Sequence, residues 1–242
     1  MRLHPHPAFF LLATLCTTPA FPQTPQLLTH LGRQADELQH KLPNFSCDES
    51  VVSEIVEHGK VRHHTTFTTT IRAQRNAKGI LEEHLGDQTY TVNIFSALVH
   101  HIPSSPLFVS GGFSQALDYF STADQACYDY RFSPGRVDFT SLPTPPSACR
   151  SSGTQGFALL DADSNVTHLE RTVQHDLAVA RNQAQFAAVD FAPVELDGQT
   201  FRLSHHVVAE MPDDKGNLRR FTAEFSKCKL FTATVTIKPA TP

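Results

Sequence analysis

The feature that most constrains the fold is a long succession of short segments in which apolar and polar residues alternate. Such alternation puts every second side chain on one face of a β-strand. The clearest case lies between residues 199 and 209, where Phe201, Leu203, Val207 and Ala209 are separated by more polar positions. Asp197-Gly198, just before it, is the strongest hairpin signal in the chain. This pattern predicts an antiparallel sheet with one apolar face, which needs a cover.

Turn signals divide most of the chain into strands of such a sheet. We expect hairpin loops at His58-Gly59-Lys60 and Pro134-Gly135, with further turns at residues 75–79, 161–165 and 211–216. Lys227-Cys228-Lys229 interrupts an apolar face and indicates a β-bulge. Residues 81–106 remain open, because Tyr90-Thr91-Val92 suggests a strand whereas residues 94–99 suit a short helix equally well.

Two segments have helical spacing and could cover the sheet. Residues 24–42 carry an apolar stripe and are followed by Pro43. Its members are Leu27, Leu28, Leu31, Ala35, Leu38 and Leu42. A second short helix is predicted near residues 110–122, with Phe113, Ala116, Leu117 and Phe120 on one face. The predicted fold class is therefore α+β: a curved antiparallel sheet covered by an N-terminal helix and a short inserted helix.

The first 22 residues have the order of a secretory signal peptide. A basic start is followed by an apolar stretch from Ala8 to Leu15, which is too short to span a bilayer, and then by small residues and proline. Four further cysteines follow in the mature region. We therefore expect one exported α+β domain over residues 23–242, in the periplasm or outside the cell.

The four cysteines allow three disulfide connectivities, and the sequence favours one of them. Cys127 begins a predicted strand, and Cys149 lies just beyond the next hairpin arm. Cys47 begins the first strand and Cys228 lies near the end of the sheet, so that bond would tie the first strand to the last. We predict the pairs Cys127–Cys149 and Cys47–Cys228.

Composition and charge exclude several classes of protein. With 40% hydrophobic and 18% charged residues, the chain has a globular composition. A net charge of −4 without a basic stripe gives no reason to expect nucleic acid. Beyond the leader, no stretch is apolar enough to cross a membrane, so we expect no transmembrane segment in the mature chain.

Chemistry-bearing motifs are few, and we predict no catalytic, cofactor or metal site. The chain has no nucleophile elbow, zinc-protease motif, phosphate loop or dinucleotide fingerprint. Histidine pairs occur at residues 63–64, 100–101 and 205–206, but neighbouring residues of a strand point to opposite faces and do not share one ion easily. The carboxylate pairs Glu82-Glu83 and Asp213-Asp214 are equally weak signals of catalysis.

Two stretches give the chain a resemblance to a known fold family. They are residues 156–171, from Gly156-Phe157-Ala158 to Leu169-Glu170-Arg171, and residues 189–203, around Asp197-Gly198. Their order of hairpins resembles the lipoprotein carriers of the LolA/LolB type, in which helices plug the concave side of a half-open barrel. The resemblance covers about the last hundred residues, and the four cysteines and longer middle insert depart from it. It implies a carrier of lipid or of a lipidated partner.

Aromatic composition agrees with an apolar ligand. The chain has 18 phenylalanines, 4 tyrosines and no tryptophan, which suits an apolar interior or pocket better than a sugar-binding surface. The leading hypothesis is an exported non-enzymatic protein that binds a hydrophobic ligand or a lipidated envelope partner. The alternatives are a structural or interaction module of the envelope without a small ligand, and an exported hydrolase.

Overall fold

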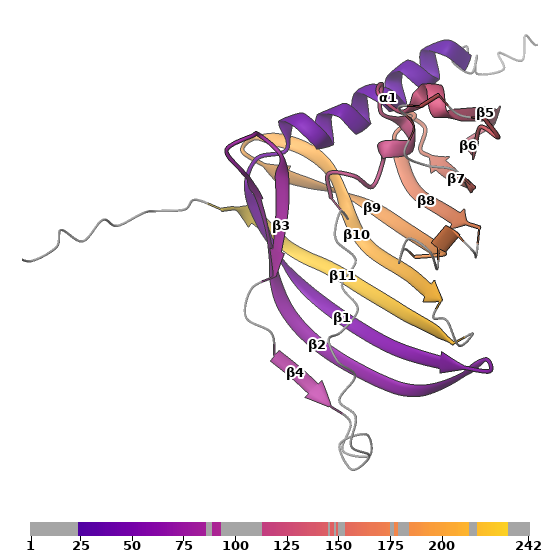
Figure 1. The fold of residues 1–242 in the computed structure, drawn as a ribbon. Helices are drawn as coiled ribbons and strands as arrows, with labels where there is room; N and C mark the ends of the chain where they lie inside the picture. Colours follow the sequence, from indigo (N-terminus) through magenta and orange to yellow (C-terminus); the bar gives the residue numbers. More distant parts are fainter. Residues whose placement is uncertain are drawn as a thin grey trace, which may run out of the picture.

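The chain folds around one curved antiparallel sheet in the computed structural model (Figure 1). The structure describes residues 24–85, 89–92, 113–144, 146–147, 149, 153–174, 177–178, 184–212 and 217–231. The predicted leader, the helical alternative at residues 94–99 and Asp213-Asp214 lie outside these residues.

Eleven strands form the sheet in the order β3-β2-β1-β11-β10-β9-β8-β7-β6-β5, with β4 also paired to β2. Their bounds are β1 Phe45–Glu57, β2 Lys60–Arg75, β3 Leu81–Leu85, β4 Thr89–Val92, β5 Tyr128–Ser133, β6 Arg136–Ser141, β7 Thr154–Leu160, β8 Val166–Val173, β9 Phe186–Leu196, β10 Gln199–Pro212 and β11 Leu218–Leu230. The order begins with β3 and ends with β5, so the sheet is an open half-barrel.

The turns predicted at residues 58–60, 75–79, 134–135, 161–165 and 197–198 lie where the strands reverse, whereas the turn predicted at residues 211–216 lies largely outside the described residues. His58 and Gly59 both have positive φ, 51° and 75°, as do Asp197 and Gly198 at 53° and 70°. These angles suit the tight hairpin turns whose twist matches the flanking strands. The predicted bulge is confirmed too: the register of β1 and β11 shifts between Ser46 and Asp48, opposite Lys227, whose φ is 50°.

The N-terminal helix is confirmed as α1, Thr24–Lys41. Most of its predicted apolar stripe is buried: Leu31 is 0% exposed, Ala35 1% and Leu38 4%, and Leu42, just after the helix, is 0% exposed. Leu28 is partly buried. Figure 1 shows α1 lying across one end of the curved sheet. Among the described residues, no helix is long and apolar enough to cross a membrane.

The predicted inserted helix is wrong as an α-helix. Residues 113–127, which we call the inserted segment, form turns and two 3₁₀ helices, η1 (Asp118–Phe120) and η2 (Gln125–Cys127). Their backbone bonds span three residues, as from Phe120 N to Leu117 O at 2.9 Å. One reason is that the Ser121 hydroxyl accepts a hydrogen bond from Asp124 N at 3.2 Å and so competes with helical bonding. Of the predicted apolar residues, Phe113, Leu117 and Phe120 are nevertheless buried and Ala116 is partly buried.

Candidate ligand-binding site

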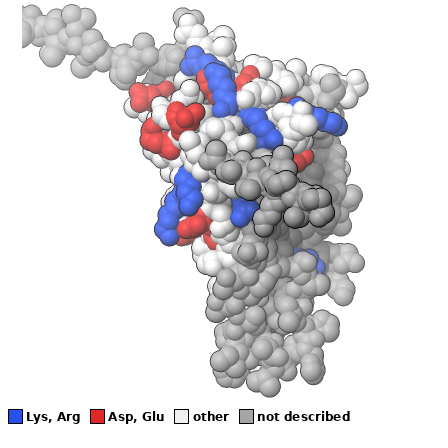
Figure 2. Space-filling view, turned by 90° about the vertical axis from the view of Figure 1, so that its left-hand side faces the viewer, with Lys and Arg blue, Asp and Glu red and all other residues white. Residues whose placement is uncertain are grey.

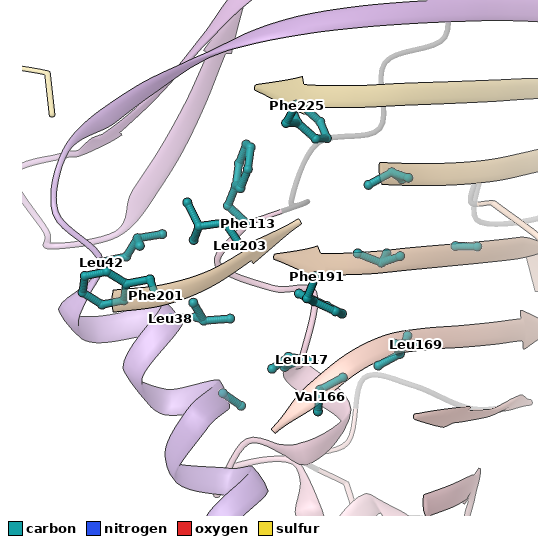
Figure 3. Close-up of a cluster of buried hydrophobic side chains, with 14 of the residues drawn as sticks. Leu38, Leu42, Phe113, Leu117, Val166, Leu169, Phe191, Phe201, Leu203 and Phe225 are labelled. Carbon is teal, nitrogen blue, oxygen red and sulfur yellow. The ribbon is translucent and has the colours of Figure 1, made fainter. Parts of the chain in front are cut away.

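The concave face of the sheet is largely apolar. Inward-facing residues of neighbouring strands make one continuous core with α1 and the inserted segment. Those from the central strands are Val189, Phe191, Phe201, Leu203, Val207, Ala209, Phe221, Ala223 and Phe225. In Figure 3, Leu38 of α1 and Leu42, just after its end, lie near Phe201 and Leu203 of β10. The concave face is thus the candidate site for an apolar ligand.

The inserted segment reaches the concave face through two sets of aromatic rings. The Phe113 ring meets Phe45 at a centroid distance of 5.0 Å and Phe225 at 4.9 Å, both edge-on. Figure 3 shows Phe113 pointing towards Phe225. Farther along, Tyr119 stacks on Phe139 at 4.7 Å. These contacts hold the segment over the sheet, and any ligand on the same surface has to replace them.

Polar bonds join the inserted segment to α1, and we call the two together the cover. Gln39 Nε2 donates to Asp118 Oδ1 at 2.7 Å, and the Thr122 hydroxyl donates to Asp36 Oδ2 at 2.6 Å. Burial raises the pKa of Asp118 to about 6, against the lowering effect of the Gln39 hydrogen bond. The two parts of the cover are therefore bonded to each other by side chains.

The space left under the cover is small. A cavity of about 100 Å³ lies between α1 and the sheet, and its lining includes Gln34, Leu38, Leu117, Phe201 and Arg202. Ligand pockets usually measure about 300–1,000 Å³, so this one holds no alkyl chain unless the cover shifts.

A larger hollow of about 800 Å³ lies at the ends of β6, β7 and β8. Threonine, serine and glutamine side chains, including Thr140, Ser141 and Gln155, contribute much of its lining. This composition does not suit an alkyl chain.

Glu49 is the residue of the concave face that sequence reasoning missed. It lies on β1 with Cys47 and Val51 on the same face, and it is 2% exposed. Burial, and secondarily the charge of Glu83, raises the pKa of Glu49 to about 7. The signal was present in the sequence, because period-two alternation puts residue 49 on the same face as residues 45, 47 and 51.

The two histidines of the pair on β10 do not share a partner. His205 and His206 point to different partners: His205 Nδ1 lies 3.1 Å from Phe225 O, and His206 Nδ1 lies 3.1 Å from Asp190 Oδ2. Asp190 also bonds His168 at 2.6 Å. Partial burial raises the pKa of Asp190, but its hydrogen bonds to His168 and His206 hold that pKa below the usual value.

His63 and His64 lie in β2, whereas residues 100–101 lie outside the described ranges. In the part of the chain that is described, no group of three or more His, Cys, Asp or Glu side chains is placed to hold a metal ion.

Charges on the face shown in Figure 2 are of both signs and interspersed.

Of the carboxylate pair Glu82-Glu83, Glu82 is solvated and accepts a hydrogen bond from Asn76 Nδ2 at 2.7 Å. Glu83 instead accepts the Phe113 backbone N–H at 3.1 Å. The pair therefore splits between the surface and the concave side.

The structure brings the four cysteines to bonding distance in the pairs that the sequence favours, Cys47 with Cys228 and Cys127 with Cys149. The first pair joins β1 to β11 at the bulge, and the second ties the end of the inserted segment to the loop after β6.

Peptide mapping without reduction is expected to recover these two cross-links from the mature protein. The loops that they close span 181 and 22 residues. Chain entropy gives about 5 and about 3 kcal/mol of stabilisation for loops of these lengths. A Cys47–Cys127 or Cys47–Cys149 peptide would contradict the pairing, as would four free thiols in protein from an oxidising compartment.

Comparison with solved structures finds several proteins to which this chain is similar. A LolA superfamily protein from Nitrosomonas europaea matches over 86% of this chain and 94% of its own, at 9% identity and a TM-score of 0.35. A DUF1329 family protein from Desulfovibrio piger matches over 87% of this chain and 92% of its own, at 15% identity and a TM-score of 0.38. A structure of lipid–protein interactions in lipovitellin matches over 81% of this chain but only 26% of lipovitellin, at 11% identity and a TM-score of 0.30.

Neither the family models nor the curated protein sequences give a match. The structural likeness concerns the fold, and at these TM-scores it transfers neither a ligand nor a role to this chain.

Proposed function

We propose that this protein is an exported, non-enzymatic carrier that binds the alkyl chain of a lipid or lipidated partner on the concave face of its sheet. One observation carries the proposal: the apolar face of an open half-barrel is closed by a small cover rather than by a second sheet. Displacing the cover exposes a surface rich in phenylalanine, which suits an alkyl chain.

The inserted segment is the part of the cover that a ligand replaces most readily. It is built of short turns, and its contacts with the sheet include the rings of Phe113, Tyr119 and Phe120. α1, by contrast, buries a full apolar stripe. A ligand chain that enters beside Phe225 replaces apolar contact by apolar contact, so the exchange costs little free energy.

Phe113→Ala is expected to strengthen the binding of a fluorescent apolar probe such as N-phenyl-1-naphthylamine. Removing the ring frees the surface between Phe45 and Phe225 for the probe. We expect the dissociation constant to fall about five- to tenfold, measured by fluorescence titration.

Ile80→Ala is the matched control, because Ile80 is 55% exposed and lies outside the core. Probe binding that is absent in both the natural protein and Phe113→Ala would overturn the carrier proposal.

Export is part of the same proposal. The order of residues 1–22 predicts a mature N-terminus at roughly residues 20–25, seen by N-terminal sequencing of protein from the native host. Recovery of intact Met1 would contradict it.

The second candidate function is an interaction module of the envelope without a small ligand. The small volume under α1 favours it, since a core that is already filled needs no ligand. The two candidates differ in the probe titration: a module whose core is permanently filled binds no apolar probe in either variant.

A further inference from the structure

Glu49 is a buried carboxyl group that no other described residue pairs with. It is 2% exposed, and within the part of the chain that the structure describes neither of its carboxylate oxygens has a hydrogen-bond partner. Its neighbours across the sheet are Thr69 on β2 and Phe225 on β11. Leaving a buried polar group unpaired costs about 1–3 kcal/mol, and more when the group is charged. A hydrophobic residue at this position would therefore stabilise the fold better.

A second carboxyl group lies near Glu49, beside the inserted segment. Glu83 of β3 accepts the Phe113 N–H at 3.1 Å, and its charge adds to the rise in the pKa of Glu49. Phe113 in turn packs on Phe225, the cross-strand neighbour of Glu49. Two carboxyl groups and a displaceable ring therefore occupy one region of the concave face.

No basic side chain among the described residues forms an ion pair with Glu49. An unsatisfied carboxyl in an apolar site calls for a donor, and the described residues supply none to Glu49. Near neutral pH this carboxyl is only partly ionised. A cation that binds there therefore displaces at most one proton from the carboxyl.

We propose that Glu49, assisted by Glu83, binds the cationic head group of an amphiphile whose alkyl chain replaces the Phe113 ring between Phe45 and Phe225. The ligand class is a single-chain or lipid-linked amphiphile with an ammonium group. An ammonium group brings up to three hydrogen-bond donors and a positive charge, which together satisfy both oxygens of Glu49. This inference rests on the proposed carrier function and adds the chemistry of the ligand's polar end.

The test compares three probes with one chain and different heads: dodecylammonium, dodecanol and dodecanoate. Each displaces the fluorescent probe from the full-length mature protein at pH 7.5, below its micelle concentration. We expect dodecylammonium to bind at least about tenfold more tightly than dodecanoate, because the anion meets two carboxyl groups. In Glu49→Gln this preference should fall to about threefold or less, while dodecanol binding changes by less than about twofold.

Glu82→Gln is the matched control, since Glu82 is on the same strand as Glu83 but solvated. It should keep the full preference; loss of the preference in this variant would show that surface charge attracts the cation, and would overturn the inference. Unchanged dodecanol binding in Glu49→Gln shows that the variant is folded, and Glu49→Leu provides a second variant if it is not.

The outcomes separate this inference from the proposed function. Equal binding of all three probes to the natural protein would overturn the role of Glu49 and leave the carrier function intact. Binding of none of them would overturn both.

Discussion

Replacing Leu31 by alanine is expected to lower the free energy of unfolding by about 2–5 kcal/mol, the range for a buried leucine whose loss leaves a cavity. Leu31 is 0% exposed at the centre of the apolar stripe of α1. Leu38→Ala, seven residues on along the same face and 4% exposed, should have an effect in the same range. Urea denaturation followed by circular dichroism measures both changes.

Lys41→Ala is the matched control on the same helix. The Lys41 side chain is 64% exposed and pairs with Glu37 over 3.1 Å at the surface. Exposed pairs of this kind contribute about 0–1 kcal/mol. If both leucine variants unfold at the midpoint of the natural protein, α1 is not docked on the sheet and the account of the cover fails.

Glu49→Gln is expected to stabilise the protein relative to the natural protein, and to do so by more at pH 8 than at pH 4.5. Burial raises the pKa of Glu49 from the usual 4.5 to about 7. Below the lower value the carboxyl is protonated in both the folded and the unfolded chain, so its ionisation does not affect the free energy of unfolding. As the pH rises towards 7, only the unfolded chain releases the proton, so folding stability is lost, and the loss is complete above the folded pKa.

The expected size of this effect follows from the two pKa values of Glu49, the usual 4.5 and about 7 in the folded chain. The difference between them corresponds to about 3 kcal/mol as an upper limit. Glutamine does not titrate, so the free energy of unfolding of the variant minus that of the natural protein should grow by about 1–3 kcal/mol between pH 4.5 and pH 8. Urea titrations at pH 4.5, 6 and 8 measure it. A difference that does not change with pH would show that Glu49 is ionised freely in the folded state.

The sheet was largely predictable because its signals are local. Asp197-Gly198 and His58-Gly59 adopt the positive φ angles that tight hairpins need, and the sequence alone marks them. The apolar stripe of α1 was equally predictable from the sequence, since leucines at helical spacing need an apolar surface to cover. The bulge at Lys227 followed from a polar interruption in an apolar face.

The cover and the site were less predictable because they depend on distant partners. The inserted segment has helical spacing, yet Ser121 and the anchoring of Phe113 and Phe120 in the core hold it in 3₁₀ turns. β3 carried no clear strand signal and is fixed by pairing with residues 71–75 of β2. The nearness of Glu83 to Glu49 arises from folding alone, because the two are 34 residues apart and on different strands.

The most direct test of the carrier function is native mass spectrometry of the mature protein, extracted gently from its own host. The account predicts a second mass above that of the protein with its processed N-terminus, matching an amphiphile with an alkyl chain. That mass should disappear after extraction with organic solvent, and the stripped protein should then bind the apolar probe. A single unliganded mass, together with stripped protein that binds no apolar probe, would contradict the account.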